Sequence, residues 1–414
     1  MVSLAETESK KLNRDVGKAM TAREPLIFVV SGEASGDNLA GALMRALKAK
    51  TGSHISFAGV GGPQSEREGL ESLFPMRELS LMGLAEVLPH LPRLIRRLNQ
   101  TVDAARRLKP DAIVTVDSPS FCRRVAHRLH GSGIPIIHYV APQLWAWRPG
   151  RAKKLAKDLD HIMALLPFEP AFFAKYGIAS TFVGHPAIES GAARGEGAAF
   201  RERHVIPPDG TLLCVVPGSR QGEARRMLPI LGGALNILKK RHPDLRLVVP
   251  VADATADLVT LIARDWPFPV TFASPGERFD AFAASDVAMA KSGTVTLELA
   301  LAGVPMVIAY RVNPATAFIV RRMISVKYAS LVNLLAERDV IPEFLQENCT
   351  PENLAAGVDA LLDSAEARDK QRQGFREVLH RLGDLSPTPS ERAAKVVLDI
   401  VQSRMNEASR SAEG

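Results

Sequence analysis

The sequence predicts an α/β protein built of two doubly wound, Rossmann-like lobes that face a cleft. The first observation is that each half of the chain carries an apolar run that leads into a Gly/Ser turn and then into a helical pattern. Residues 26–30 lead into 31–37 (SGEASGD), and residues 212–216 lead into 217–220 (PGSR). A strand that delivers such a turn to a helix N-terminus directs free N–H groups at one point, which suits an anion.

The second observation is the alternation of short apolar runs with longer amphipathic ones. Strands separated by helices imply parallel pairing in a doubly wound sheet. The predicted strands are residues 26–30, 55–60, 112–116, 134–139, 161–165 and 180–183 in the first half, and 212–216, 245–249, 270–272, 287–290 and 306–309 in the second. The predicted helices include residues 38–50, 94–108, 122–129, 222–240, 294–302 and 351–364.

The length of 414 residues is sufficient for two domains. Residues 1–24 are charged and lack the apolar segment of a secretory signal, which predicts a disordered extension. We expect an N-terminal lobe over 25–188, a small, Gly-rich linker over 189–202 and a C-terminal lobe over 203–385. Residues 386–414 are predicted to form a C-terminal helix and tail, and the helix has one apolar face, Ala393, Val396, Val397, Ile400 and Val401. That face can pack on its own first lobe or on a partner's.

Composition excludes several classes of protein. The net charge of +7 fits a solvated basic surface as well as an acidic partner. Nucleic acid is the weaker choice of partner because Lys and Arg are dispersed and no aromatic-basic motif accompanies them.

Cys122, Cys214 and Cys349 lie far apart without metal-type spacing, so they are expected to be buried thiols in a reducing compartment. No stretch reaches the roughly 18 apolar residues of a membrane-spanning helix.

Two carboxylate-bearing turns stand out in the first half. Glu33 and Asp37 place carboxylates in the turn at 31–37, which favours contact with sugar hydroxyls over phosphate; the alternative is that Asp37 caps the next helix. Asp117 directly follows the strand at 112–116. A carboxylate at the carboxyl end of a parallel strand opens toward the ligand crevice of such folds, so Asp117 is the candidate general base. Its alternative is also a helix cap.

The turn at 217–220 is the better phosphate site. Ser219 offers a hydroxyl, and Arg220 offers a bidentate fork at the start of a helix. The alternative is a helix with a generally basic surface, because Arg225 and Arg226 follow closely.

A third turn, at Ser292, Gly293 and Thr294, lies between a predicted strand and a helix. Glu298 follows one helical turn after Thr294 and can accept both hydroxyls of a ribose, as the acidic residue does in dinucleotide folds. The alternative is a first-turn glutamate stabilised by the helix dipole.

Aromatic and imidazole groups are further candidates. Trp145 and Trp147, two of the three tryptophans, stand close together and can stack on a sugar or fill the core. His138 and His185 lie near the ends of predicted strands, where a lone histidine is more often structural than functional.

Residues 82–97 mix large aliphatic side chains with arginines, a composition typical of a segment in an anionic membrane interface. A buried loop and helix with a basic edge is the alternative. Pro89 and Pro92 argue against one long regular helix here. The predicted membrane contacts are Leu84, Val87, Leu88, Leu91, Arg93, Arg96 and Arg97.

Taken in order, these motifs resemble those of the lipid-A-disaccharide synthases, a family of bacterial glycosyltransferases (family 19) with the GT-B fold. The resemblance spans most of the chain, and the ordered set is far more specific than any one motif. The matching stretches are residues 31–37 (SGEASGD), 59–63 (GVGGP), 82–88 (MGLAEVL), 117–119 (DSP), 145–148 (WAWR), 165–169 (LLPFE), 183–186 (VGHP), 217–220 (PGSR), 292–294 (SGT) and 333–335 (NLL).

The resemblance implies a step of lipid A, and hence lipopolysaccharide, biosynthesis. UDP-2,3-diacylglucosamine would be joined to 2,3-diacylglucosamine 1-phosphate through a β-1,6 linkage, with inversion and release of UDP. Asp117 would take the proton of the acceptor's 6-hydroxyl, and Glu33 would organise the acceptor or the base. The implied substrate-binding residues are Ser219, Arg220, Ser292, Gly293, Thr294, Glu298, Asn333, Trp145, Trp147 and His185.

The sequence departs from the family pattern at a few positions. Ser120 stands where members often have an acidic residue, which removes a second carboxylate that could share the proton transfer with Asp117. Cys122 stands where members often have Asn, and Ala141 and Val332 also differ from the family pattern. No metal or cofactor is implied, because Arg220 and helix N-termini can neutralise the diphosphate.

Acylated substrates and a basic, amphipathic segment predict peripheral attachment to the anionic cytoplasmic face of the inner membrane. The sequence does not decide whether the protein forms a homodimer. The rival hypotheses are another GT-B enzyme of UDP-sugars, such as a hexosamine 2-epimerase, and a non-catalytic binder of nucleotide-sugars or anionic lipids.

Overall fold

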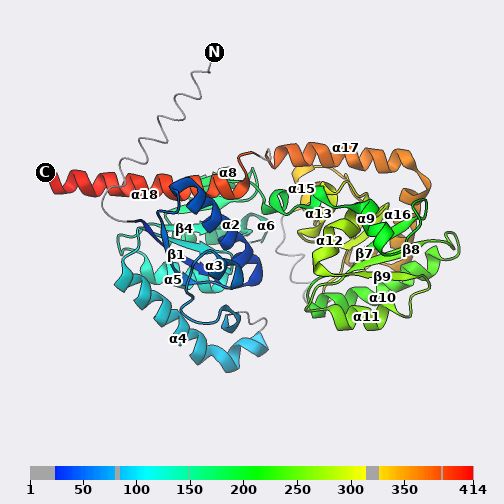
Figure 1. Ribbon diagram of the computed structural model, residues 1–414, viewed down its shortest axis with the longest axis horizontal. Coiled ribbons are helices and arrows are strands. Elements are labelled where there is room, and N and C mark those ends of the chain that lie inside the picture. Colours follow the sequence, from blue (N-terminus) through cyan, green and yellow to red (C-terminus); the bar gives the residue numbers. More distant parts are fainter. Residues whose placement is uncertain (1–23, 80–83, 148, 314–325, 384–385, 414) are drawn as a thin grey trace, which may run out of the picture. The chain divides into compact units, whose positions relative to one another are not determined.

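The computed structural model describes residues 24–79, 84–147, 149–313, 326–383 and 386–413 (Figure 1). The chain divides into two compact units. Unit 1 comprises Met1–Gly184 and Pro387–Gly414, and unit 2 comprises His185–Ser386. Almost all of the extension expected over residues 1–24 lies outside the described residues.

Unit 1 is built on a parallel six-stranded sheet in the order β2-β1-β3-β4-β5-β6. β1 pairs with β2 on one side and with β3 on the other, so the strand order reverses between β1 and β3. The six strands are β1 (Leu26–Ser31), β2 (Ser56–Val60), β3 (Ala112–Val116), β4 (Ile136–Tyr139), β5 (His161–Ala164) and β6 (Ser180–Phe182).

Helices bury both faces of this sheet, which explains the continuous apolar runs of its strands. Ile27 and Val29 of β1 face a core completed by α2 (Ala34–Thr51) and α18 (Pro389–Glu413). Phe28 and Val30 face the other core. That core is completed mainly by α4 (Leu84–Leu108) and α5 (Pro119–Leu129), and the shorter helices are α3 (Pro63–Arg67), α6 (Leu144–Trp147), α7 (Ala152–Leu155) and α8 (Glu169–Ala174).

Unit 2 repeats this plan with the order β12-β11-β10-β7-β8-β9, all parallel, and its strand order reverses between β7 and β10. The eleven predicted strands all coincide with strands of the structure; the twelfth, β12, was not predicted because its three half-buried residues form no apolar run. The strands are β7 (Leu212–Val216), β8 (Arg246–Pro250), β9 (Val270–Ala273), β10 (Val287–Lys291), β11 (Met306–Tyr310) and β12 (Glu343–Leu345).

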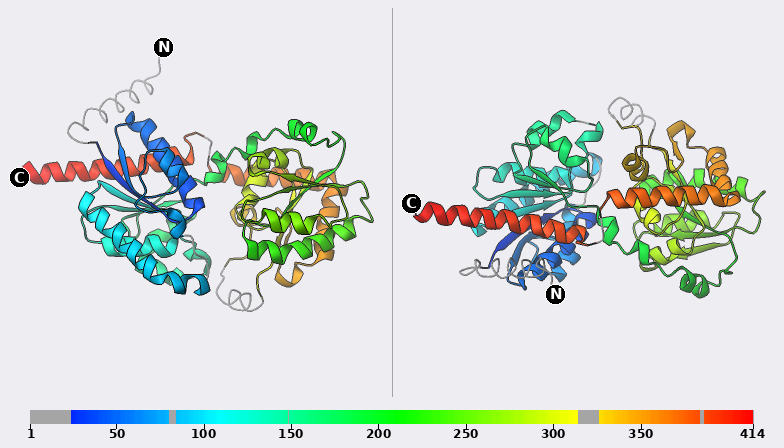
Figure 2. Two further views of the ribbon diagram at one scale, coloured as in Figure 1. Left: turned by 60° about the horizontal axis from the view of Figure 1, so that its bottom comes forward. Right: turned by 90° about the horizontal axis from the view of Figure 1, so that it is seen from above.

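One face of the second sheet packs against α10 (Gln221–Leu238) and α16 (Pro351–Asp363), which contact each other and enclose the apolar core of this unit (Figure 2). Leu213 and Val215 of β7 point into that core. The remaining helices are α9 (Gly197–Arg203), α11 (Ala256–Ala263), α12 (Arg278–Ala283), α13 (Val295–Leu301), α15 (Leu331–Ala336) and α17 (Ala365–Arg381).

The division between the units follows Gly184 and so differs from the linker predicted over 189–202. That stretch folds within unit 2 as the 3₁₀ turn η4 (Ala192–Arg194) and α9, which pack against α12. A Cβ on Gly195 or Gly197 would lie 2.1 or 2.4 Å from a backbone carbonyl oxygen of Phe279 or Ala283. These glycines therefore allow close packing rather than flexibility.

The C-terminal helix α18 packs on α2 of its own unit. Ala393, Val397 and Val401 are buried there, as the predicted apolar face requires. The side chain of Arg392, on α18, also donates to the carbonyl of Val183, directly after β6 (2.6 Å). The apolar face of α18 is thus covered within its own chain.

One expectation about the segment at 82–97 is wrong. Pro89 and Pro92 do not interrupt the helix, because α4 runs continuously from Leu84 to Leu108. A proline removes one backbone hydrogen bond of a helix, and packing elsewhere along the helix can outweigh that loss. Leu98 and Val102, in the second half of α4, are buried in the core of unit 1.

Candidate functional site

In unit 1 the two predicted turns meet where the strand order reverses. The turn at 31–37 follows β1 and the turn at Asp117 follows β3, its neighbour in the sheet. A Cβ on Gly32 would lie 2.5 Å from Ser118 Oγ, and one on Gly36 would lie 3.5 Å from Asp117 Cβ. The two glycines therefore bring the first turn into contact with the second. Such a reversal is where doubly wound sheets bind ligands.

Asp117 and Ser118 turn the chain sharply at the end of β3. Both adopt positive φ angles, 52° and 45°, which are uncommon for residues other than glycine. The N–H of Asp117 donates to the Tyr139 carbonyl at the end of β4 (3.0 Å). Its half-buried carboxylate accepts a hydrogen bond from Ser35 Oγ (3.0 Å). The strained turn thus holds this carboxylate at the carboxyl edge of the sheet.

Buried Cys122 and His138 lie beside this carboxylate. Burial raises the pKa of the Cys122 thiol, and the charges of Asp117 and, more weakly, Glu33 raise it further. Burial lowers the pKa of His138 to about 4, against the opposing effect of Asp117, so the imidazole is neutral at pH 7. Its Nδ1 pairs with Thr115 Oγ1 (2.8 Å), a contact within the sheet.

Asp37 has a different role from Glu33. Its buried carboxylate accepts hydrogen bonds from three backbone N–H groups, those of Gly62 (2.8 Å), Gln64 (2.8 Å) and Ser65 (3.1 Å). Ser65 Oγ donates a fourth (2.6 Å). These donors form the start of α3, so Asp37 caps a helix remote in sequence rather than the helix it belongs to. It is a structural residue of the turn.

The two tryptophans are placed differently. Trp145 Nε1 donates to Glu169 (3.0 Å), and its ring meets Phe168 edge-on. Trp147 is 41% exposed and so has ring surface to offer a ligand. The buried carboxylate of Glu169 also accepts from the N–H groups of Leu165 and Leu166, and burial raises its pKa to about 7. Glu169, the first residue of α8, therefore ties α6, which carries Trp145, to the turn before α8.

His185 is buried at the start of unit 2. Its Nδ1 accepts the N–H of Ala187 (3.1 Å), which caps the 3₁₀ turn η3 (Pro186–Glu189). Burial lowers its pKa to about 4, so the ring is neutral at pH 7. The imidazole of His185 therefore acts as a cap of the turn η3 in this structure.

In unit 2 the two predicted donor turns are also neighbours. The turn at 217–220 follows β7 and the turn at 292–294 follows β10, and the strand order reverses between these strands. Ser219 and Arg220 are exposed just before α10, as are Gly293 and Thr294 before α13. Ser292 is buried instead and donates its hydroxyl to the carbonyl of Ala329 (2.9 Å).

Glu298 is held by a residue that the sequence analysis did not identify. Arg278, on α12, donates to Glu298 Oε1 (2.9 Å) and lies over the ring of Phe279. Burial raises the pKa of Glu298, and the charge of Arg278 opposes that rise. Because the two residues are twenty positions apart on different helices, no local sequence pattern links them.

Asn333 is fully buried and all its amide groups are engaged. Its Nδ2 donates to the Ile341 carbonyl (2.8 Å) and to Glu343 (2.9 Å), and its Oδ1 accepts from Val340 (2.8 Å) and Ile341 (2.9 Å). Glu343 also accepts from the N–H groups of Ala329 and Ser330. Asn333 therefore clamps the chain around Ala329, which in turn holds Ser292.

Comparison with known proteins decides the family. The sequence model described as lipid-A-disaccharide synthetase matches residues 27–397. The chain belongs to the lipid-A-disaccharide synthase family. It is 52% identical to the lipid-A-disaccharide synthase of Rhodospirillum centenum over 383 residues, 92% of this chain and 96% of that protein. It is 48% identical to that of Paramagnetospirillum magneticum, over 91% of this chain and 98% of the relative.

Solved structures show the same two-unit fold as this member of the lipid-A-disaccharide synthase family. Staphylococcus aureus MnaA with UDP aligns with a TM-score of 0.59 at 12% identity, covering 92% of this chain and 97% of that one. Acinetobacter baumannii MurG aligns with a TM-score of 0.53 at 14% identity, covering 92% and 99%. The predicted GT-B fold class, with two Rossmann-like lobes, is confirmed.

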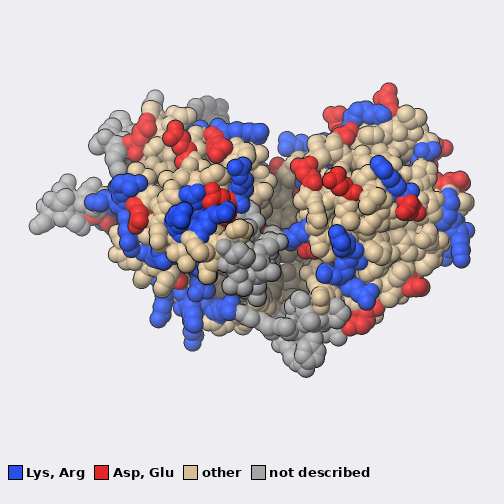
Figure 3. Space-filling view, turned by 90° about the horizontal axis from the view of Figure 1, so that it is seen from below, with Lys and Arg blue, Asp and Glu red and all other residues tan. Residues whose placement is uncertain are grey.

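The segment expected at the membrane starts outside the described residues, and for α4 the structure describes side chains from His90 onward. In that part Leu91 and Ile95 are 37% and 44% exposed, and Arg93 and Arg96 are exposed beside them. Arg97 instead pairs with Glu78 (2.8 Å). Figure 3 shows basic side chains gathered on the face of unit 1 where α4 lies. No described helix is long and apolar enough to cross a membrane.

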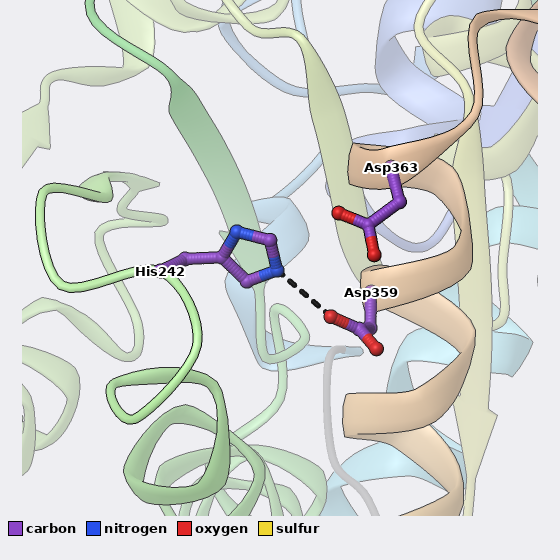
Figure 4. Close-up of side chains that lie close together, drawn as sticks. All are labelled: His242, Asp359 and Asp363. Atoms are coloured by element: carbon purple, nitrogen blue, oxygen red, sulfur yellow. Dashed lines mark hydrogen bonds and ion pairs between the residues drawn. The ribbon is translucent and has the colours of Figure 1, made fainter.

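A cluster of three metal-type donors lies at the opposite, amino-terminal edge of the second sheet. His242 Nε2 meets Asp359 Oδ1 (2.8 Å), and Asp363 lies one turn further along α16 (Figure 4). Arg241 pairs with both carboxylates. Because Arg241 and His242 already pair with these carboxylates, the cluster is a polar network that ties the loop after α10 to α16.

Proposed function

We propose that this chain is an inverting glycosyltransferase that joins UDP-2,3-diacylglucosamine to 2,3-diacylglucosamine 1-phosphate. The product is the β-1,6-linked disaccharide 1-phosphate of lipid A biosynthesis, and UDP leaves. One observation supports the proposal most directly. In a chain of this family, the turns that carry Glu33 and Asp117 lie at the strand-order reversal of the first sheet. The turns that carry Arg220 and residues 292–294 lie at the corresponding reversal of the second sheet. Those are the ligand-binding edges of doubly wound folds.

Asp117 is the proposed base. Its carboxylate takes the proton of the acceptor's 6-hydroxyl while that oxygen bonds to the donor's anomeric carbon and the bond to the diphosphate breaks. Ser35 supports this role by orienting the carboxylate through its hydrogen bond. The imidazole of His138 is buried and pairs with Thr115 Oγ1 inside the sheet, so it is placed less well than Asp117 to meet a substrate hydroxyl. Glu33 is proposed to orient the acceptor.

The donor is proposed to bind at unit 2. Arg220, with its exposed guanidinium, faces the charge that develops on the departing diphosphate. Ser219 and Thr294 supply hydroxyl groups, and Glu298 accepts hydrogen bonds from the ribose. Arg278 supports Glu298 by donating a hydrogen bond to its carboxylate, and its charge opposes the rise in pKa that burial causes. Ser292 and Asn333 act indirectly, because their contacts hold the turn in place.

We infer that α4 attaches the protein to the cytoplasmic face of the inner membrane. Exposed Leu91 and Ile95, with Arg93 and Arg96 beside them, suit the boundary between acyl chains and anionic head groups. Replacing Leu84, Val87, Leu88 and Leu91 with serine is expected to weaken sedimentation with anionic liposomes. Leu261→Ser, at an exposed leucine of unit 2, is the control. Unchanged liposome binding of the α4 variant would exclude this segment.

Product analysis tests the proposed reaction. Purified protein is incubated with both acylated substrates in mixed micelles, and product is followed by mass spectrometry; the disaccharide 1-phosphate and an equal amount of UDP are expected. A parallel reaction contains UDP-N-acetylglucosamine alone. Turnover only in the parallel reaction would replace the proposal with a UDP-hexosamine epimerase. UDP binding by folded protein without product in either reaction would indicate a non-catalytic binder.

A further inference from the structure

Lys291 lies beside the proposed diphosphate site, and the sequence analysis gave it no role. It is the last residue of β10, in the row of side chains that Val287 and Met289 direct into the core beneath α10. Its side chain is 14% exposed, and Nζ lies 3.0 Å from Glu223 Oε2. Lys291 is therefore a largely desolvated cation at the strand-order reversal of unit 2.

The stem of this lysine runs along the turn at 217–220. Gly218 has φ of +113°, and a Cβ there would lie 3.7 Å from Lys291 Cδ and 3.5 Å from Glu223 Oε2. On its other side, Nζ lies 5.1 Å from the centre of the Tyr310 ring. The ammonium group thus sits between the turn that carries Ser219 and Arg220 and the end of the next strand.

Glu223 shares its carboxylate between two cations. Oε2 meets Lys291, and Oε1 meets Arg220 Nη1 (3.4 Å). Glu223 also lies in the first turn of α10, an eighteen-residue helix whose N-terminal dipole favours a negative charge. Burial raises the pKa of Tyr310, at the end of β11, and the charge of Glu223 raises it further.

The surroundings of this carboxylate are those that a diphosphate requires: two cations of different exposure and a helix N-terminus. We propose that Glu223 substitutes for the donor's diphosphate in the nucleotide-free protein, and that Lys291 becomes a ligand of the diphosphate when the nucleotide binds. The proposal rests on the proposed function. The diphosphate carries more negative charge than one carboxylate and so competes successfully for Lys291 and Arg220. Lys291 is thereby a binding residue and Glu223 a positioning residue.

Calorimetric titration of UDP and uridine separates diphosphate contacts from nucleoside contacts. Lys291→Gln is expected to raise the Kd for UDP about tenfold or more and to leave the Kd for uridine within about twofold. Lys291→Arg retains most of the UDP affinity. Glu223→Gln removes the competing charge and is expected to lower the Kd for UDP by about threefold or more. Lys240→Gln, with the same charge change at an exposed position after α10, is the control.

Acetylation of the wild-type protein gives a second measurement that does not depend on a folded variant. UDP is expected to protect Lys291 from an amine-acetylating reagent, whereas uridine is not. UDP affinity unchanged in Lys291→Gln, an equal loss of UDP and uridine affinity, or absence of protection would overturn the role of Lys291. An equal or weaker UDP affinity in Glu223→Gln would overturn the role of Glu223. Absence of UDP binding by the wild type would instead contradict the proposed function itself.

Discussion

Replacing Asn333 with alanine is expected to destabilise unit 2 rather than to remove a substrate contact. The side chain is fully buried and makes four hydrogen bonds of 2.8–2.9 Å, two donated and two accepted. A net contribution of about 1 kcal/mol each, together with the buried groups left unsatisfied, gives a loss of roughly 3–5 kcal/mol in the free energy of unfolding. Weaker donor binding would follow indirectly, because Asn333 helps to hold Glu343, which binds the N–H of Ala329, and the carbonyl of Ala329 holds Ser292 in the donor turn.

Urea unfolding measures this effect in unit 2 alone when Trp145 and Trp147 are replaced by phenylalanine. The remaining tryptophan, Trp266, is buried in the core of unit 2 and reports on that unit. Asn353→Ala, at an exposed asparagine of α16, is the control, and it is expected to cost less than about 1 kcal/mol. If Asn333→Ala unfolded like the control while its Kd for UDP rose about tenfold, Asn333 would be a substrate contact instead.

Two further predictions concern buried carboxylates. Burial raises the pKa of Glu169 from 4.5 to about 7. Between these two pH values the folded unit 1 keeps a proton on Glu169 that the unfolded chain has released. The free energy of unfolding of unit 1 should therefore fall by roughly 3 kcal/mol as the pH rises from 4.5 to about 7. Unfolding curves measured across this pH range should show no such fall in Glu169→Gln. A fall equal to that of the wild type would contradict the assignment. Arg278→Gln should raise the donor's KM about tenfold at little change in kcat, because Glu298 loses the partner that orients it. Arg278→Lys should recover part of the loss, and steady-state kinetics with an unchanged KM would argue against that role.

The fold was predictable because its strands are buried on both faces. Such strands appear as continuous apolar runs, and the turns that follow them carry the site. β12 was missed because its three residues form no such run. They include Glu343, whose carboxylate accepts a hydrogen bond from Asn333. The predicted linker was misplaced for another reason. A glycine that allows close packing, such as Gly195, has the same sequence signature as one that provides flexibility.

The site was predictable as a set of turns but not in the role of each side chain. Glu33 and Asp37 look equivalent in sequence, yet the donors that fix Asp37 come from residues 62–65. Likewise, the partners of Asn333 lie at residues 340–343, and Arg278 and Glu298 meet only through the packing of two helices. Structural and functional polar residues differ in such tertiary contacts, which a single sequence does not display.

The central claim, that Asp117 is the base of a glycosyl transfer, is tested most directly by comparing wild type with Asp117→Asn. The measurement is single-turnover formation of the disaccharide from saturating acylated substrates, with the Kd for UDP determined on the same preparations. We expect the rate to fall by about 10²-fold or more in the variant while the Kd for UDP and the unfolding midpoint stay unchanged. A variant that forms product at a rate close to wild type would contradict it.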